Sequence, residues 1–529
     1  MGHGVSLCRL RSHLCHPLLY RGFCGVVVSH SLLPSPAMIH HLRVFTGVIL
    51  LTCIGGLAGQ QFKTMTRPGL PSGKQATFKL AVGDVNGDGM PDIVYANMGT
   101  TVPGTQNQLY LADGKGGYVD ATKTNLPVKT DWSGAVVLAD LDGDSDLDIV
   151  FGNLGGDSKL YLNDGKGVFK DAGTKLPYVP TTIYAIVAGD VDGDKDLDLV
   201  MGFYVLLNDG KATFKFGTSL PVQKRSWGSA IGDVDSDGDL DVIVGGFRLQ
   251  PNLFLNDGKG VFSDGTSQLP PMFVDVRGNF GLGDVDGDKD LDIYFPNING
   301  QNRLYLNDGK GKFTDVTSAQ LPQVSTQEYA SVLGDVDNDG DLDAMTAGTT
   351  GAVATQNKIY LNDGKGTFSD DTKTRVPSVS DNSVCCVLAD MDLDGDLDFV
   401  IGNWEAQNTL WINLHRHTYA QSQPRIGRNY ALDFYGLPGY ATVAQAVVAF
   451  GGLVLTPRVL VSPYGYLGVH PVGLFLLPSG VIKSPGGKFT MSLPIPNDSN
   501  FRGFELAWQG LILQKSALRL TNAFVDKVR

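Results

Sequence analysis

Seven short segments of the chain concentrate carboxylates at a fixed spacing. Each runs for nine residues with an oxygen-bearing side chain at positions 1, 3, 5 and 9, as in DVDGDKDLD at 284–292. Hard cations such as Ca²⁺ take about six to eight oxygen ligands from carboxylates, carbonyls and water. In such a loop the side chains at positions 1, 3, 5 and 9 can converge, while position 7 offers its carbonyl. The spacing therefore predicts cation sites.

The residues predicted to supply these oxygens form one set in each loop. They are Asp84, Asn86, Asp88, Met90 and Asp92; Asp140, Asp142, Asp144, Asp146 and Asp148; Asp190, Asp192, Asp194, Asp196 and Asp198; Asp233, Asp235, Asp237, Asp239 and Asp241; Asp284, Asp286, Asp288, Asp290 and Asp292; Asp335, Asp337, Asp339, Asp341 and Asp343; and Asp390, Asp392, Asp394, Asp396 and Asp398. The first loop has Asn86 at position 3, so it is the least charged, and we expect it to bind a cation most weakly.

The alternative is a set of solvated acidic turns. With up to five carboxylates in nine residues, mutual repulsion would strain each turn unless a cation neutralised it. Mg²⁺ is less suited because it demands octahedral geometry and keeps its waters. The loops are not EF-hands, since no Glu stands at position 12. Up to seven structural Ca²⁺ ions are therefore predicted.

The elements that position these loops follow from a repeat. The loops start 43 to 56 residues apart, and each of the first six is followed by a second motif of the type LYLNDGKGVF (160–169). A small-residue strand precedes each Asp loop and an apolar strand follows it. The LYLN stretch is a third strand, NDGKG a hairpin turn, and a fourth strand runs from Phe to Leu-Pro. Four antiparallel strands per repeat predict an all-β, seven-bladed β-propeller over residues 61–415, with a solenoid as the runner-up.

The two ends of the repeat region predict how the ring closes. The seventh repeat lacks its fourth strand, while the segment 62–71 aligns without gaps to the fourth strand at 313–322. Adding this N-terminal strand to the last blade would remove the open edges.

These motifs resemble the FG-GAP/VCBS repeats of integrin α-chain propellers and many secreted bacterial proteins. The resemblance rests on the DxDxDGxxD loop after a small-residue strand and on its LYLNDGKGxF companion, and it covers residues 62–414. It implies a propeller with Ca²⁺ loops on one face and adhesion or ligand recognition on the other. Integrin-type propellers use only some of their loops for metal, whereas here every repeat carries one.

Composition agrees with an all-β, cation-binding protein. Among 529 residues there are 67 Gly, 26 Pro and 55 acids, of which only Glu328, Glu405 and Glu505 are Glu. Asp favours turns and Glu favours helices. The net charge is −13 and is concentrated between residues 60 and 415, which excludes nucleic-acid binding by charge.

The ends of the chain predict export and a further domain. Residues 38–60 have a basic start, an apolar run and small residues at Ala58-Gly59, as in a secretory signal peptide, so that 1–37 becomes an upstream extension outside the native protein. A membrane anchor and a lipid on Cys53 are the weaker alternatives. Residues 416–529 are apolar and basic, with runs typical of a small β-sandwich. The run 441–455 is expected to form two strands rather than a membrane span.

The remaining cysteines and histidines argue against other chemistry. After signal cleavage only Cys385-Cys386 remains, expected as buried free thiols rather than a strained vicinal disulfide. The His residues of the mature chain, His415, His417 and His470, lie outside the blades, so no Ser–His–Asp triad or His-rich zinc site can form there. An enzyme built on a propeller scaffold and a purely structural envelope component are the alternatives to a binding module.

Ligand recognition is predicted on the face opposite the Asp loops. The connections between strands two and three, and between strand four and the next strand one, carry aromatic and basic residues, a composition typical of binding hot spots. They are Trp132, Tyr178, Arg225, Trp227, Phe247, Arg248, Phe273, Arg277, Tyr329 and Trp404. The expected partner is an extracellular protein or glycan.

Overall fold

The computed structural model describes residues 61–414, except for 66–68, 100–103, 115, 156, 222–225, 272–273, 299, 324–326 and 350–353, and the backbone of strands between 418 and 527. The predicted upstream extension and signal peptide, with Cys53, and the three histidines lie outside the described residues. In the part of the chain that is described, no helix has the length and apolar character to cross a membrane.

Four-stranded antiparallel units follow one another along the chain, and each Asp loop joins the first strand of a unit to its second. The units are β2 (Gln75–Gly83), β3 (Asp92–Asn97), β4 (Gln108–Ala112) and β5 (Tyr118–Asp120); β6 (Ser133–Ala139), β7 (Asp148–Asn153), β8 (Lys159–Leu162) and β9 (Lys170–Asp171); β10 (Ile186–Gly189), β11 (Asp198–Met201), β12 (Tyr204–Leu207) and β13 (Lys215–Phe216); β14 (Gly228–Gly232), β15 (Asp241–Gly245), β16 (Asn252–Leu255) and β17 (Ser263–Asp264); β18 (Gly281–Gly283), β19 (Asp292–Phe295), β20 (Arg303–Leu306) and β21 (Thr314–Asp315); β22 (Glu328–Gly334), β23 (Asp343–Gly348), β25 (Lys358–Leu361) and β26 (Ser369–Asp370); and β28 (Ser383–Ala389), β29 (Asp398–Ala406), β30 (Thr409–Asn413) and β1 (Phe62–Thr64).

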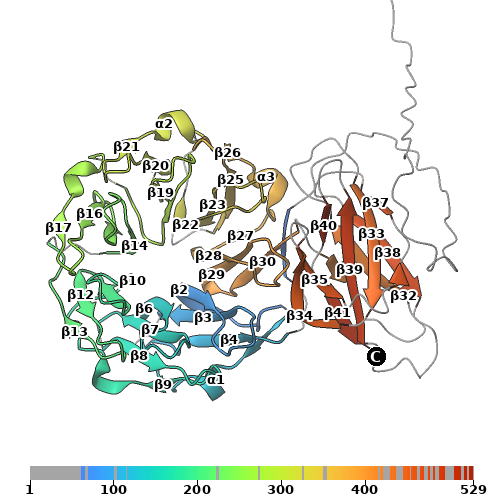
Figure 1. The fold of residues 1–529 in the computed structure, drawn as a ribbon, viewed down its shortest axis with the longest axis horizontal. Helices are drawn as coiled ribbons and strands as arrows, with labels where there is room; N and C mark the ends of the chain where they lie inside the picture. The colour runs from blue at the N-terminus through green and yellow to red at the C-terminus, as the bar shows by residue number, and fades with distance from the viewer. Residues whose placement is uncertain are drawn as a thin grey trace, which may run out of the picture. The chain divides into compact units, whose positions relative to one another are not determined.

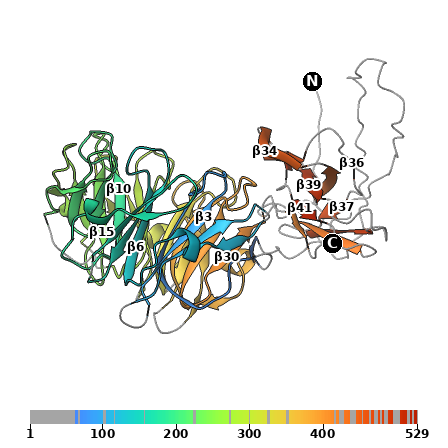
Figure 2. The same ribbon diagram turned by 90° about the horizontal axis from the view of Figure 1, so that it is seen from below.

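The first strands of successive units contact one another around a ring, in the order β2, β6, β10, β14, β18, β22, β28 and back to β2. Figure 1 shows the units arranged around a ring, and Figure 2 shows the same units after a turn of 90°. The predicted β-propeller fold is confirmed. Its second strands are the most buried, as in β7, where every residue is buried, because neighbouring units cover both faces of each sheet.

The predicted closure by the N-terminal strand is also confirmed. β1 pairs antiparallel with β30, with Phe62 opposite Asn413 and Thr64 opposite Trp411. The last and first units are joined further by pairing of β29 with β2 at Ala406 and Gln75. Because the first strand of the propeller region completes the same blade as its last strands, β30 is paired at the junction instead of being left as an open edge.

The predicted fourth strand, from Phe to Leu-Pro, is wrong in length. The strand covers two or three residues and is followed in most units by a short helical turn. These turns are α1 (Thr122–Asn125), η1 (Gly173–Lys175), η2 (Thr266–Gln268), α2 (Thr317–Gln320) and α3 (Thr372–Arg375). The reason is local: the Asp that ends the strand accepts the backbone N–H two residues on, as Asp315 does from Thr317 at 3.0 Å, and this pattern starts a turn.

A repeated asparagine links each unit to the one before it. The Asn of the LYLN motif donates its Nδ2–H to the carbonyl of position 2 of the preceding Asp loop, at 2.7–2.9 Å. The pairs are Asn163–Val85, Asn208–Leu141, Asn256–Val191, Asn307–Val234, Asn362–Val285 and Asn413–Val336. At the junction of the last unit with the first, the equivalent residue is Ala112, whose side chain has no hydrogen-bond donor.

Installing the missing donor is expected to stabilise the protein. The backbone at Ala112 already matches the other units, since its N–H donates to Asp92 Oδ1 at 2.8 Å, as that of Asn163 does to Asp148 at 2.9 Å. Ala112→Asn should therefore reach the carbonyl of Met391 and raise the free energy of unfolding by about 0.5–1.5 kcal/mol. Chemical denaturation measures it, with Asn163→Ala as the opposite change. An unaltered midpoint for Ala112→Asn would show that this junction is held differently.

Cys385 and Cys386 are both free and buried, as predicted. They lie on β28, and their side chains belong to different hydrophobic clusters, one shared with the first unit and one with the sixth. Burial raises the pKa of the Cys385 thiol to about 12 and also raises that of Cys386, so both cysteines act as small apolar core residues.

The chain beyond residue 417 is described only as backbone strands. A three-stranded sheet contains β31 (Thr418–Ala420), β32 (Asn429–Tyr435) and β38 (Lys488–Pro494). A six-stranded sheet contains β33 (Gln445–Gly452), β36 (Phe475–Leu476), β37 (Gly480–Ile482), β39 (Glu505–Leu513), β40 (Leu518–Leu520) and β41 (Phe524–Lys527), and β34 (Val454–Val461) pairs with β35 (Gly465–Val469). The run 441–455 thus contributes to two strands, as expected.

One further pair of strands lies within the propeller region. β24 (Thr355–Gln356), between β23 and β25, pairs with β27 (Ser380–Asp381), which precedes β28.

Candidate metal centres and the opposite face

The backbone of each Asp loop wraps around the carboxylate at position 1. In the second loop, Asp140 accepts the N–H groups of Gly143 at 2.9 Å and Ser145 at 3.0 Å. Both donors have positive φ, 79° and 75°, which aims successive N–H groups at one point. The side chain of Asp144 accepts the N–H of Asp146 at 3.0 Å. The loop thus holds its carboxylates in place by its own backbone.

The carboxylate at position 9 ties the loop to the sheet. Asp148 is buried; its Oδ2 accepts the N–H of Leu141 at 3.1 Å, and its Oδ1 accepts that of Asn163, at the end of the third strand, at 2.9 Å. The same two bonds recur in all seven loops. This framework role was not evident from the sequence, where position 9 was predicted only as a metal ligand.

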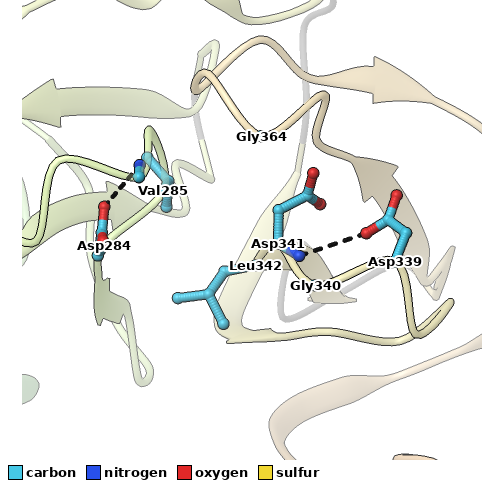
Figure 3. A pocket seen from close by; sticks show the side chains of 8 residues that line it. Asp284, Val285, Asp339, Gly340, Asp341, Leu342 and Gly364 are labelled. Carbon is cyan, nitrogen blue, oxygen red and sulfur yellow. Dashed lines mark hydrogen bonds between the residues drawn. The ribbon is translucent and has the colours of Figure 1, made fainter.

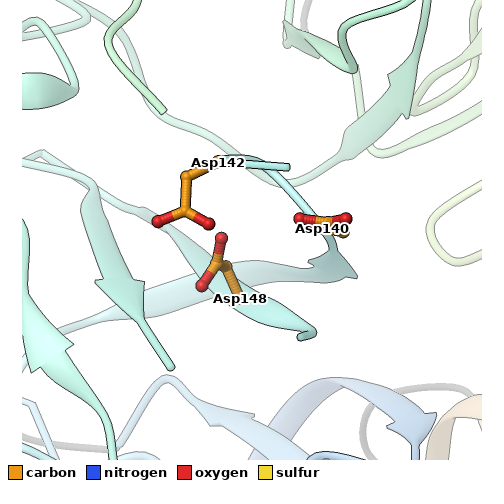
Figure 4. A group of neighbouring side chains, drawn as sticks. All are labelled: Asp140, Asp142 and Asp148. Carbon is orange, nitrogen blue, oxygen red and sulfur yellow. The ribbon is translucent and has the colours of Figure 1, made fainter. Parts of the chain in front are cut away.

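The carboxylates of most loops converge as a metal site requires. Single oxygen atoms lie within 4.8 Å of one another in the groups Asp140–Asp142–Asp148, Asp190–Asp192–Asp194, Asp233–Asp235–Asp241, Asp284–Asp286–Asp292 and Asp335–Asp337–Asp339. Figure 4 shows the first of these, with the three carboxyl groups facing one another. The buried Oδ1 atoms at position 3, in Asp142, Asp192 and Asp337, have no hydrogen-bond partner. An all-oxygen set with unsatisfied acceptors fits a hard cation.

Burial shapes the proton affinity of these groups. It raises the pKa of Asp148 to about 6, that of Asp92 to about 7 and that of Asp343 to about 8, against the lowering effect of the backbone N–H groups that each accepts. In the seventh loop, burial raises the pKa of Asp390 to about 7, with neighbouring carboxylates adding to the effect. Without a cation, the ionisation of each of these carboxyl groups in the folded state costs free energy.

A pH dependence of the metal-free protein follows. For a group whose pKa is about 7 folded and near 4 unfolded, the folded state binds more protons between these values. The contribution of these groups to the stability of the folded state should thus be highest below pH 4, and it should fall as the pH rises through 7. In EDTA the melting temperature is expected to drop from pH 5 to pH 8, while the increase produced by added Ca²⁺ grows over the same range. Equal increases at both pH values would contradict metal binding by these carboxylates.

The sixth loop differs because an arginine lies against it. The side chain of Arg375, at the end of α3, is 10% exposed; its Nη1 lies 3.3 Å from Asp337 Oδ2, and its Nε lies 2.9 Å from Asp371 Oδ2. The same guanidinium donates to Gln61 Oε1 at 2.8 Å, just before the closing strand β1. Gln61 in turn donates to the carbonyl of Val336 in the sixth loop at 2.6 Å. The closing strand and the sixth loop therefore share one hydrogen-bond network.

A cavity of about 290 Å³ lies between the fifth and sixth loops. It is lined by Asp284, Val285 and Gly287 from one loop and by Asp339, Gly340, Asp341, Leu342 and Gly364 from the next unit (Figure 3). Its carboxylates belong to the two candidate metal sites. The cavity lies where neighbouring loops meet, so the sequence did not reveal it.

On the opposite ends of the strands, aromatic side chains from five units converge. Phe78 lies 5.7–6.4 Å, between ring centroids, from each of four partners, and two of these partners stack on each other at 4.3 Å with planes 6° apart. The partners are Tyr184, Trp227, Tyr329 and Trp404, with Tyr184 and Trp227 forming the stack. We call these five residues the axial aromatic cluster. Three of the residues predicted for ligand binding are therefore packed together rather than free on the surface.

A second group on this face is more exposed. The Arg277 guanidinium lies 4.3 Å from the centre of the Phe247 ring and donates to both oxygens of Asp275, at 3.0 and 3.2 Å. Arg248 lies 5.2 Å from the same ring. We call Phe247, Arg248, Asp275 and Arg277 the arginine platform.

Of the other residues predicted for this face, Tyr178 and Trp132 belong to neither the axial aromatic cluster nor the arginine platform. Tyr178 is 61% exposed. The Trp132 ring lies so close to Gly104 that a Cβ atom there would overlap it. Arg225 and Phe273 lie outside the described residues.

Solved structures give only distant similarities. The crystal structure of the biofilm matrix protein Bap1 from V. cholerae matches with 15% identity over 76% of this chain and 68% of that chain, with a TM-score of 0.27. The six-bladed β-propeller fungal lectin from Aleuria aurantia matches with 13% identity over 50% of this chain and 86% of that one, with a TM-score of 0.30. No curated protein matches the sequence.

The family model for the FG-GAP-like repeat matches residues 84–151, 140–201, 233–295, 284–346 and 349–430. These segments together cover more than half of the chain and contain every Asp loop. They agree with the strand–loop–strand geometry described above. The chain belongs to the FG-GAP-like repeat family.

Proposed function

We propose that this protein is a secreted binding module, a seven-bladed propeller stabilised by Ca²⁺, that recognises an extracellular protein or glycan and is not an enzyme. The proposal rests on one observation: the two ends of the propeller strands carry different kinds of side chain. Acidic loops that fit cations occupy one end of the strands, and aromatic and arginine side chains gather at the other. Aromatic residues and Arg are enriched in binding hot spots.

The proposed residues differ in role. The Asp loops hold the cations and give the ring rigidity, with side chains at positions 1, 3 and 5 as ligands. The carboxylate at position 9, already bound by two N–H groups, keeps the loop on the sheet and has oxygen lone pairs left for metal. The opposite face carries the ligand. Calcium then affects recognition only through the stability of the blades.

A binding screen tests this function. Purified protein should bind at least one member of a panel of glycans and extracellular matrix proteins in saturable fashion and without turnover, and EDTA should weaken binding in step with unfolding. Turnover of a bound glycan would support an enzyme instead. Absence of binding to any member, with folded calcium-loaded protein, would support a purely structural component of the cell envelope.

A further inference from the structure

The arginine platform is an exposed cationic site on an acidic protein. The side chain of Arg248 is 67% exposed, Phe247 is 42% exposed, and Arg277 is 21% exposed. Two guanidinium groups face a single carboxylate, Asp275, so the platform carries one net positive charge. The chain as a whole has a net charge of −13, so the sign of the platform's charge is opposite to that of the chain.

The two arginines are not equivalent. Arg277 uses both oxygens of Asp275, which is buried, and is thereby fixed over the Phe247 ring. Arg248 lies 3.8 Å from the same carboxylate, beyond ordinary hydrogen-bond distance. Its guanidinium therefore keeps its donors available to a ligand, while Arg277 serves mainly to position the ring.

The backbone holds Arg248 in this place under strain. Its φ is +52°, a left-handed conformation that side chains other than Gly, Asn and Asp rarely adopt. The next residue, Leu249, forms a bridge with Val274, which brings the connection between β15 and β16 against the connection that leads to the fifth unit. A strained residue with an exposed, charged side chain is consistent with a functional position.

An aromatic side chain and a buried lysine lie near the platform in the fold. Burial raises the pKa of Tyr329, which belongs to the axial aromatic cluster, and the positive charge of Arg277 partly opposes this rise. Tyr329 therefore lies within electrostatic range of the Arg277 guanidinium. Lys79, next to Phe78, is buried and donates to Asn279 Oδ1 at 2.6 Å, and among the described ion pairs none involves it. Burial lowers the pKa of Lys79 to about 8.

We infer that the arginine platform binds a carboxylate-bearing sugar, a uronic acid residue of an acidic polysaccharide, with Arg248 contacting the carboxylate and Phe247 contacting the sugar ring. An arginine fork matches a carboxylate in geometry and charge. The negative face of an aromatic ring attracts the polarised C–H groups of a sugar. An acidic peptide would satisfy the arginine alone, so the exposed ring favours the sugar. This inference rests on the proposed binding function and names its ligand class.

The test uses the full chain at saturating Ca²⁺ with short ligands that do not form gels. Oligogalacturonides and oligoguluronates are compared by calorimetry with the methyl-esterified oligogalacturonide, which keeps the ring but not the charge, and with an oligoglutamate peptide. Binding of a free uronate that weakens with added salt, with little binding of the ester or the peptide, is the expected result. Equal binding of the ester, stronger binding of the peptide, or no binding of either uronate would overturn the inference.

Variants locate the site. Phe247→Ala combined with Arg248→Gln should lower uronate affinity by at least about tenfold, the loss of one charge-assisted contact. The matched control is Lys215→Gln with Phe216→Ala, a neighbouring basic and aromatic pair on β13 that is also exposed. It should leave affinity within about twofold.

A third variant separates binding from folding. Arg248→Gly relieves the left-handed conformation and should raise the melting temperature while abolishing uronate binding. Retained uronate binding by Arg248→Gly would overturn the assignment. The assignment would also be wrong if only changes in the Asp loops abolished uronate binding, since the cations would then hold the carboxylate of the ligand. If uronates fail but another ligand from the screen binds, the proposed function stands and this inference alone is wrong.

Discussion

Removal of divalent cations with EDTA is expected to lower the melting temperature by on the order of 10–20 °C, because several cation sites each stabilise the folded state by mass action. At a free Ca²⁺ concentration about 100 times the Kd, one site contributes about 2.7 kcal/mol. The described region has no disulfide among its cysteines, so the loops have no covalent support. Ca²⁺ should restore the melting temperature more fully than Mg²⁺, whose octahedral geometry suits these loops less well.

Single loops should show a smaller part of the same effect. Asp286→Asn with Asp288→Asn weakens the fifth site, and is expected to lower the melting temperature in Ca²⁺ but to change it little in EDTA. The control is Asp157→Asn, whose side chain is 66% exposed and lies outside the loops. An identical melting curve with and without EDTA would sink the idea that metal holds the propeller together.

Loss of the closing strand is expected to have a comparably large effect. Phe62 is fully buried and packs in one cluster with Trp411 and Phe399. Phe62→Ala should therefore cost about 3–5 kcal/mol of unfolding free energy. Phe216→Ala, which removes a ring that is 47% exposed, should cost well under about 1 kcal/mol. Urea denaturation compares the two directly.

Deletion of residues 62–71 goes further. It exposes the edge of β30 and leaves Arg375 without the amide of a correctly placed Gln61, so the truncated protein should aggregate or lose the cooperativity of its unfolding. A synthetic peptide covering 60–71, added in trans, should restore a monomer in size-exclusion chromatography. If the truncated chain remains monomeric and equally stable, β1 is dispensable and another contact closes the ring.

The local pattern of the sequence determined the repeating unit. Period-two strands, glycine turns and nine-residue Asp loops are each read within a few residues, and their recurrence identified the propeller and its closing strand. The helical turns after the fourth strands were missed, although the Asp that begins each of them is visible in the sequence. In that case the short-range hydrogen bond to the backbone outweighed the strand pattern.

Only the tertiary structure decided which side chains meet across units. Lys79 and Asn279 are 200 residues apart in sequence, and Arg375 and Gln61 are 314 apart. The sequence predicted Trp227, Tyr329 and Trp404 as separate ligand contacts, and the ring brought them together around Phe78. It also placed Arg277 and Arg248 on one phenylalanine. Local spacing fixes the loops because each loop is its own ligand cage, whereas the opposite face is assembled from different units, and its contacts depend on the closure of the whole ring.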